Sequence, residues 1–219
     1  MNWKGLHVVT IERFKRVVTS ADELTELLGS PSESGLKKQL SELDSHMKTF
    51  IATSPFLLLG TVGNDGRCDV SPRGDMPDVG KVLDSRTLAI PEWNGNRRAD
   101  SLRNIIQTGR VGLLFLTPGL GETLRVNGRA SVIRDDDVLA SLSKQGKQPM
   151  VGIGVEIDEC FFQCAKALIR SRLWEWSAEN SDPPPFDFAE ILVDQTKIEG
   201  LEVEPLRQQI EESYKNRLY

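Results

Sequence analysis

The chain has 219 residues, enough for one large domain or two small ones with a substantial core. Its 27 Lys and Arg against 32 Asp and Glu give a net charge near −5, so no global basic field favours nucleic acid or an anionic membrane surface. Charged residues interrupt every long apolar stretch, including the N-terminal one, which is atypical of a membrane span or a secretory signal. The sequence therefore predicts a soluble cytoplasmic protein with no nucleic acid and no membrane among its partners.

Cysteine and histidine are too few and too scattered for the sites they usually build. Cys68, Cys160 and Cys164 show no CxxC spacing, and His7 and His46 are the only histidines. A disulfide framework, a zinc site and a histidine-based triad are therefore all disfavoured. If the protein is an enzyme, we expect a bound cofactor to carry the reaction, and we assign no metal ligand and no catalytic side chain.

Two helices are predicted before the first strand. Ser20 and Glu23 have the spacing of a capping box, and Gly29 follows as a stop signal for a short helix. From Gly35 to Ile51, apolar residues recur at steps of three and four. This spacing predicts a single amphipathic helix that packs on a core.

Short apolar segments separated by turn residues predict six strands. They lie near residues 56–62, 67–71, 87–90, 111–116, 123–133 and 151–157, and a short surface helix is predicted at 135–145. Asn, Asp and Gly between neighbouring segments are typical of hairpin turns. Because a βαβ repeat is not evident, the pattern favours an antiparallel barrel or sandwich within an α+β domain. Further helices are expected near 186–197 and 204–218.

The stretch from Pro91 to Gln107 predicts an anion site. Turn-forming residues precede an amphipathic helix expected from about Arg97 to Gln107, which puts Arg97 and Arg98 in its first turn. The amides at a helix N-terminus already present partial positive charge, so two cations there are unfavourable unless an anion binds. A phosphate held by the amides and both guanidinium groups would account for the pattern. The alternative is that both arginines are solvated.

Four segments then occur in an order that is specific to one family. They read FIATSPFLLLGTVGNDGRCDVSPRGD, VLDSRTLAIPEWNGNRRADSLRNI, RVGLLFLTPGLGETLRVNGRA and FFQCAKALIRSRLW. Together, over roughly residues 20–176, they resemble the pyridoxamine 5′-phosphate oxidase-like family of FMN-binding split barrels, most of all an uncharacterised bacterial branch with SPRGD and a GNxR turn. The resemblance implies an α+β fold with a mainly antiparallel six-stranded split β-barrel and peripheral helices. It also implies a homodimer with FMN at the subunit interface.

The same resemblance divides the chain into three parts. Residues 1–50 are expected to form an N-terminal helical extension packed on the barrel, and residues 51–176 the FMN-binding split-barrel domain. Residues 177–219 are expected to form a proline-containing linker and C-terminal helices within the same structural unit.

The resemblance implies a first group of cofactor contacts around the phosphate. Gly95-Asn96-Arg97-Arg98 resembles the family's Gly-Ser-Arg-Lys phosphate loop, and the sequence leaves open which arginine holds the phosphate. Ser71 and Arg73, in SPRGD, would lie beside the cofactor, where Arg73 would stabilise negative charge on the phosphate or on the reduced ring. The alternative for Arg73 is an ion pair with Asp75 or a surface position. The backbone at Ile90 and Pro91 would line the edge of the ring.

A second group of contacts is implied further along the chain. Arg125 is expected to reach FMN from the second subunit, or else to point outward from its strand. Lys166, Arg170 and Trp174 recur every four residues, which on one helix would place them on one face. That face would close the flavin pocket or hold an anionic substrate, with Trp174 as a lid. The alternative is a solvated basic stripe beside a packed tryptophan.

The C-terminal part departs from the best-known family member. Only RSRLWEW precedes the proline linker, in place of that enzyme's arginine- and tryptophan-rich signature, so oxidation of pyridoxamine 5′-phosphate is not expected. The favoured interpretation is an FMN-dependent oxidoreductase of unidentified substrate. Two alternatives stay open: a flavin-binding or sensing module without turnover, and a relative that binds haem or a deazaflavin. The scarcity of histidines disfavours haem.

Overall fold

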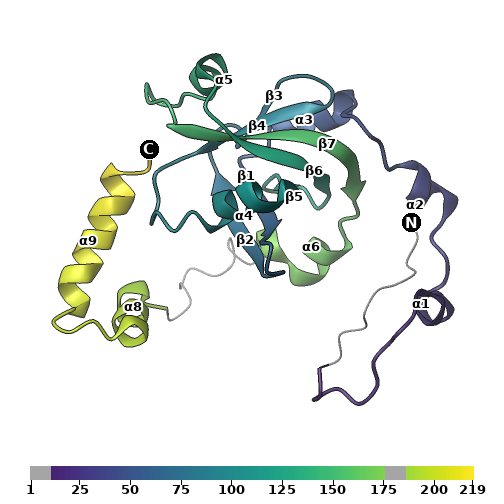
Figure 1. Ribbon diagram of the computed structural model, residues 1–219, viewed down its shortest axis with the longest axis horizontal. Helices are drawn as coiled ribbons and strands as arrows, with labels where there is room; N and C mark the ends of the chain where they lie inside the picture. The colour runs from purple at the N-terminus through teal and green to yellow at the C-terminus, as the bar shows by residue number, and fades with distance from the viewer. Residues whose placement is uncertain (1–10, 176–185) are drawn as a thin grey trace. The chain divides into compact units, whose positions relative to one another are not determined.

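The chain forms two compact units, residues 1–39 and 40–219. The computed structural model describes residues 11–175 and 186–219, and each unit is described by itself (Figure 1). The linker expected before residue 186 lies outside the described residues. The predicted division at residues 50 and 176, and the packing of the N-terminal extension on the barrel, stay predictions.

The first unit contains two short helices, α1 (Ala21–Leu28) and α2 (Glu33–Lys37). The predicted cap of α1 is confirmed, since Ser20 Oγ accepts a hydrogen bond from the Glu23 amide at 3.1 Å. Glu23 in turn accepts from the Thr19 amide, one residue before the position that a capping box uses. All side chains of both helices are at least partly exposed, so local capping, rather than a core, defines these elements.

The prediction of one helix from Gly35 to Ile51 is wrong. Helix α2 ends at Lys37, and the next helix, α3 (Ser45–Ala52), belongs to the second unit. Between them the main chain of Leu40 exchanges hydrogen bonds with Cys160 at 3.0 and 2.8 Å, which requires an extended backbone. Asp44 then caps α3 by accepting from the Met47 amide at 2.8 Å. The apolar spacing continues across the break because Leu43 packs into the same core as α3.

The second unit is built on one antiparallel sheet of seven strands in the order β2-β1-β5-β6-β7-β4-β3. The strands are β1 (Phe56–Val62), β2 (Cys68–Gly74), β3 (Lys81–Val82), β4 (Thr87–Glu92), β5 (Arg110–Leu116), β6 (Thr123–Ile133) and β7 (Val151–Gln163). The expected hairpins β1–β2 and β5–β6 are present. The strand beyond the predicted six is β3, because two residues are too short to show an alternating pattern.

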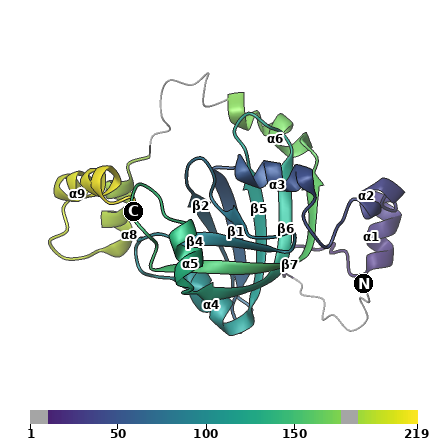
Figure 2. The ribbon, with the colours of Figure 1, turned by 90° about the horizontal axis from the view of Figure 1, so that it is seen from above.

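Helices cover the ends of this sheet. Figure 2 shows α3 and α4 (Asp100–Thr108) at opposite ends of the strands β1 and β5. Further helices are α5 (Asp136–Ser141), α6 (Lys166–Ser171), α8 (Phe188–Thr196) and α9 (Val203–Asn216). The mixed α and β content agrees with the predicted fold class. Within the part of the chain that the structure describes, every helix is too short or too polar to cross a bilayer.

The core lies between the inward faces of the strands and the helices α3 and α4. Its fully buried side chains include Ile51, Leu57, Leu59, Phe115, Leu124 and Ile153. Each such side chain contributes about 1.5–3 kcal/mol relative to an exposed position. Cys160 belongs to this core, and burial raises the pKa of its thiol to about 11, so it stays protonated and unreactive at neutral pH.

The two ends of the sheet meet through side chains instead of strand pairing. In the described residues β2 pairs only with β1, and β4 pairs with β7 and β3. Arg73 on β2 nevertheless forms an ion pair with Glu92 at the end of β4. Just beyond both strands, the indole Nε1 of Trp93 donates to Asp75 at 2.9 Å. We call the line formed by Arg73, Asp75, Glu92 and Trp93 the seam.

We expect Gly128→Ala to lower the free energy of unfolding by about 1–3 kcal/mol. The β6–β7 register shifts at Asn127/Gly128, and an added Cβ at residue 128 would overlap the main-chain oxygen of Glu156. A matched strand glycine, Gly60, has its nearest neighbour at an ordinary 3.5 Å, so Gly60→Ala should change stability by less than about 1 kcal/mol. Urea denaturation measures both. Equal effects would contradict the close approach at the register shift.

Candidate functional site

Strand β2 carries its polar residues on the face that points to the interior. Asp69, Ser71 and Arg73 share a face because residues alternate along a strand. Ser71 and Arg73 stand opposite Leu59 and Leu57, which are fully buried. Val70 points the other way and is 66% exposed. This inverts the usual pattern of a half-buried strand, so polar groups occupy the interior side of the sheet next to the seam.

A chain of hydrogen bonds ties this polar face to the start of α4. Ser71 Oγ lies 2.9 Å from Ser101 Oγ, and Ser101 donates to Asp69. Asn104, one turn further along α4, donates to Thr61 Oγ1 at 3.0 Å. The buried hydroxyls are therefore all satisfied, and β2 and α4 hold each other in register.

Arg73 is the most enclosed cation of this region. Its side chain is 16% exposed and that of Glu92 is 20% exposed. One terminal nitrogen pairs with Glu92 and the other donates to Ser71 Oγ at 3.3 Å, but the buried Nε has no acceptor among the described residues. Burial raises the pKa of Glu92, an effect that Arg73 offsets only in part. The ion pair considered for Arg73 therefore exists, with Glu92 instead of Asp75 as partner.

The loop expected to bind phosphate precedes α4 instead of forming its first turn. Helix α4 begins at Asp100, so the prediction that Arg97 and Arg98 lie inside the helix is wrong. Arg97 and Ala99 take left-handed φ values of 61° and 54°, which turn the chain twice before the helix starts. Arg97 and Arg98 are therefore not cations within the first turn of the helix, and their position does not by itself require a bound anion. Both arginines remain exposed next to the N-terminus of α4.

The loop is ordered by contacts of its own. Asn96 Oδ1 accepts from the Arg98 amide at 3.0 Å, and Arg98 Nε donates to Asp100 at 2.8 Å, a bond that raises the pKa of Arg98. Ala99, the residue before α4, has no polar side chain with which to cap the helix. The first amides of α4 are therefore left for other acceptors.

A hollow of about 360 Å³ opens between this loop, β2 and α4. Its charged lining consists of Asp65, Arg67, Asp69, Arg98, Asp100 and Arg103. Two of these arginines already pair with neighbouring carboxylates, Arg67 with Asp65 and Arg98 with Asp100. The hollow is thus of mixed charge, and an anion in it would have to compete with three carboxylates.

Ile90 and Pro91 lie within β4. Both are buried, and they stand opposite Ile153 and Gly152 of β7. The Ile90 side chain is fully enclosed in the core and Pro91 is buried, so at these two positions only the backbone is left to contact a ligand. The expected backbone contact with a ring stays a prediction.

Arg125 lies on the outer face of the sheet. It is in the same row as Leu114, Leu58 and Pro72, so two strands separate it from β2, a distance of about 14 Å. Its guanidinium carbon lies 5.4 Å from the centre of the Phe161 ring. Because its neighbours Leu124 and Val126 point into the core, Arg125 and Arg73 face opposite sides of the sheet.

The basic stripe predicted after β7 is interrupted. Lys166 and Arg170 are exposed on α6, but Arg172 takes a left-handed φ of 50° and ends that helix, so Trp174 does not extend the face. Trp174 Nε1 instead donates to the Leu120 main-chain oxygen at 2.7 Å, in the β5–β6 turn. The sequence-predicted residues therefore form two groups along the chain, one at the seam and the α4 loop, and one that consists of Arg125 on β6 with the residues of and after α6.

Sequence reasoning missed the partners that complete the seam. Glu92 is absent from the predicted site residues, although a carboxylate at the end of a buried strand needs an ion-pair or hydrogen-bond partner. Tyr219 was missed as well: its hydroxyl donates to Asp75 at 2.9 Å and its ring meets Trp93 edge-on. A contact between residues 144 positions apart leaves no local signal.

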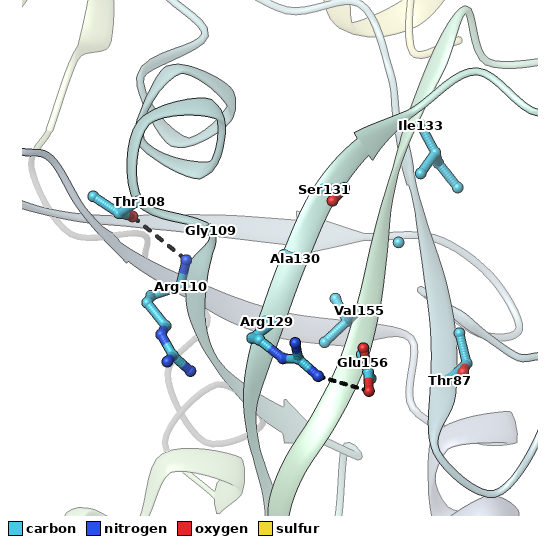
Figure 3. A pocket seen from close by; sticks show the side chains of 11 residues that line it. Thr87, Thr108, Gly109, Arg110, Arg129, Ala130, Ser131, Ile133, Val155 and Glu156 are labelled. Atoms are coloured by element: carbon cyan, nitrogen blue, oxygen red, sulfur yellow. Dashed lines mark hydrogen bonds and ion pairs between the residues drawn. The ribbon is translucent and has the colours of Figure 1, made fainter.

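A larger hollow, of about 550 Å³, lies elsewhere (Figure 3). Figure 3 shows Arg129 pointing at Glu156, and the two are 2.8 Å apart. Arg110, on its rim, pairs with Asp158 at 2.8 Å. None of the sequence-predicted residues lines it. Over the described ranges, His, Cys, Asp and Glu side chains form no cluster suited to a metal ion.

One comparison with known proteins identifies a family. The family model described as pyridoxamine 5′-phosphate oxidase matches residues 43–164, more than half of the chain. No curated protein matches.

Solved structures are similar at low identity. HupZ of Group A Streptococcus is 16% identical, with a TM-score of 0.47 over 56% of this chain and 94% of that one. A putative pyridoxamine 5′-phosphate oxidase of Lactobacillus delbrueckii is 24% identical, with a TM-score of 0.46 over 57% and 98%. An FMN-binding protein of Syntrophomonas wolfei is 14% identical, with a TM-score of 0.42 over 52% and 82%.

We expect the seam to make stability depend on pH in a defined direction. Because the pKa of Glu92 is raised above 4.5, the folded state takes up a proton there at a higher pH than the unfolded state does. The stability that protonated Glu92 contributes is fully present below the pKa of Glu92 in the unfolded state. It is lost as the pH rises through the pKa of Glu92 in the folded state. The unfolding free energy of the parent chain, minus that of Glu92→Gln, should therefore fall as the pH rises from about 4.5 towards neutral. Urea denaturation across this range measures the difference, and a difference that rises with pH would contradict the assignment.

Proposed function

The chain belongs to the pyridoxamine 5′-phosphate oxidase family, and on this premise we propose that it binds FMN and acts as a flavin-dependent oxidoreductase on an unidentified substrate. The observation that carries the proposal is the unpaired Nε of Arg73. A guanidinium nitrogen that is buried without an acceptor costs about 1–3 kcal/mol or more. An anionic or carbonyl group of a ligand at the seam would satisfy it.

The residues around the α4 loop fit a phosphate. Arg97 and Arg98 are exposed, and the first amides of α4 lack a side-chain cap, so two charged donors and a helix N-terminus lie together. Arg98 is held by Asp100, which leaves Arg97 as the guanidinium with the greater freedom to turn to a phosphate. The carboxylates of the neighbouring hollow favour a position on the outer side of the loop, away from Asp69.

Bound FMN supplies the hydride chemistry, and the protein supplies orientation and charge. In this proposal Arg73 faces the negative charge of the phosphate or of the reduced ring, and Ser71 and Glu92 fix its orientation. The β4 backbone near Pro91 lines the ring. The described residues add no unpaired general base at the seam, because its carboxylates are engaged by Arg73, Trp93 and Tyr219.

A homodimer would bring the two predicted groups together. Arg125 faces away from Arg73 in one chain, so both contact one ligand only if a second copy presents its outer face. Strand β2 lies at the edge of the sheet, and Val70 is exposed on its outer face. A second copy that packs on this outer face would cover Val70. We propose that Arg125, Lys166 and Arg170 act on the flavin of the partner.

Replacing Arg97 or Arg73 by Ala should weaken FMN binding at least tenfold, because each change removes a charged donor from the phosphate or the ring. Arg110→Ala is the matched control: Arg110 is exposed, as Arg97 is, and paired to a carboxylate, as Arg73 is, but it borders the large hollow instead. The measurement is the visible spectrum of the purified protein, followed by titration of the apoprotein with FMN. Loss of binding in Arg110→Ala alone would move the site to the large hollow, and a chain that binds no FMN would refute the proposal.

Val70→Glu should shift the protein from dimer to monomer, since a charge would be buried in the proposed interface. Leu27→Glu places the same charge at a similarly exposed apolar residue of the first unit and should leave the oligomeric state unchanged. Sedimentation velocity measures both. A parent chain that is monomeric with FMN bound would exclude the shared site.

A binding module without turnover is the second candidate, because the carboxylates of the seam are already engaged by Arg73, Trp93 and Tyr219. Anaerobic reduction of the bound flavin by NADH or NADPH, followed by reoxidation with added acceptors, separates the two functions.

A further inference from the structure

Three groups from distant parts of the chain converge on Tyr219. Its hydroxyl donates to Asp75 Oδ1 at 2.9 Å, and its main-chain oxygen accepts from Lys147 Nζ at 3.0 Å. Its ring stands edge-on to the Trp93 ring, with the centroids 4.9 Å apart and an interplanar angle of 89°. The hydroxyl, the ring and the main-chain oxygen of this one residue are therefore each contacted by a different group.

The side chain that accepts the hydrogen bond from the Tyr219 hydroxyl is a buried carboxylate, Asp75. Asp75 is only 7% exposed, and its other contacts are the Met76 amide and the Trp93 indole, both neutral donors at 2.9 Å. Its nearest basic neighbour in the chain, Arg73, is engaged with Glu92. A buried carboxylate needs hydrogen-bond donors, and the Tyr219 hydroxyl supplies one that the barrel itself does not.

The three residues that contact Tyr219 all lie outside the C-terminal segment that carries it. Asp75 follows β2, Trp93 follows β4, and Lys147 lies between α5 and β7, so all three belong to segments that flank the sheet. Beside them a hollow of about 340 Å³ remains, lined by Glu92, Trp93, Asn94, Lys147, Gln148, Pro149, Met150 and Tyr219. A volume of this size lies within the range of small-molecule sites.

We propose that Asp75, Trp93 and Lys147 form a binding site for a hydroxylated aromatic ring that carries an anionic or carbonyl group, and that Tyr219 occupies this site as an internal plug. Asp75 accepts from the ring hydroxyl, Trp93 packs on the ring, and Lys147 holds the oxygen at the other end. A small phenol of this class binds when Tyr219 is removed, and Tyr219 excludes it when in place. The proposal stands on these contacts alone and does not depend on the flavin.

The test is calorimetric titration of the full chain with 4-hydroxyphenylacetate, and with phenylacetate as the probe that lacks only the hydroxyl. Tyr219→Ala should bind 4-hydroxyphenylacetate at least tenfold more tightly than the parent chain does, and at least tenfold more tightly than it binds phenylacetate. Adding Lys147→Met to Tyr219→Ala should weaken binding at least fivefold, since the carboxylate then loses its partner.

Equal affinity of the parent and Tyr219→Ala, equal affinity for the two probes, or no binding at all would overturn the proposal. If Tyr219→Ala fails to fold, Tyr219→Phe takes its place, because it keeps the ring contact with Trp93 and removes only the hydroxyl that Asp75 accepts. That variant should still bind 4-hydroxyphenylacetate more tightly than the parent. FMN content, read from visible absorbance in the same samples, keeps this result separate from the flavin proposal.

Discussion

The ion pair between Arg73 and Glu92 is the contact on which the arrangement at the seam depends. The strands at the two ends of this seven-stranded sheet do not pair with each other. The half-buried ion pair between Arg73 and Glu92 spans the opening that is left. Because burying the two charges costs desolvation energy, the ion pair contributes little net stability. Its role is to fix how β2 and β4 are positioned relative to each other. The polar face of β2, the start of α4 and the contacts of Trp93 all take their places relative to it.

The polar face of β2 explains how a core and a binding region share one strand. Leu57 and Leu59 on β1 fill the interior, and the adjacent positions on β2 carry Arg73 and Ser71. Interior polar groups are tolerated because their hydroxyls bond to α4 and to each other. The Nε of Arg73 is the one buried side-chain nitrogen or oxygen for which the described residues supply no partner.

The elements that sequence reasoning predicted correctly are those with a local signal. Alternation identified the long strands, Ser20 marked the first helix, and the hairpin turns followed from Asn and Gly. The start of α4 was misplaced because Arg97 and Ala99 adopt a left-handed backbone that their side chains disfavour. The family resemblance pointed to Arg73 and the loop, but the partners Glu92 and Tyr219 are fixed by folding alone, and no spacing along the chain encodes them.

Strand β2 is also a free edge, and an open edge is a template for the addition of another chain. Pro72 lacks an amide hydrogen in the middle of this strand, and charged side chains point inward on either side of it at Asp69 and Arg73. Proline and inward-pointing charge are two of the devices by which natural sheets resist edge-to-edge aggregation. The residues that prepare the seam for a ligand thus also protect the protein, while it is unliganded, from growing into a continuous sheet with its neighbours.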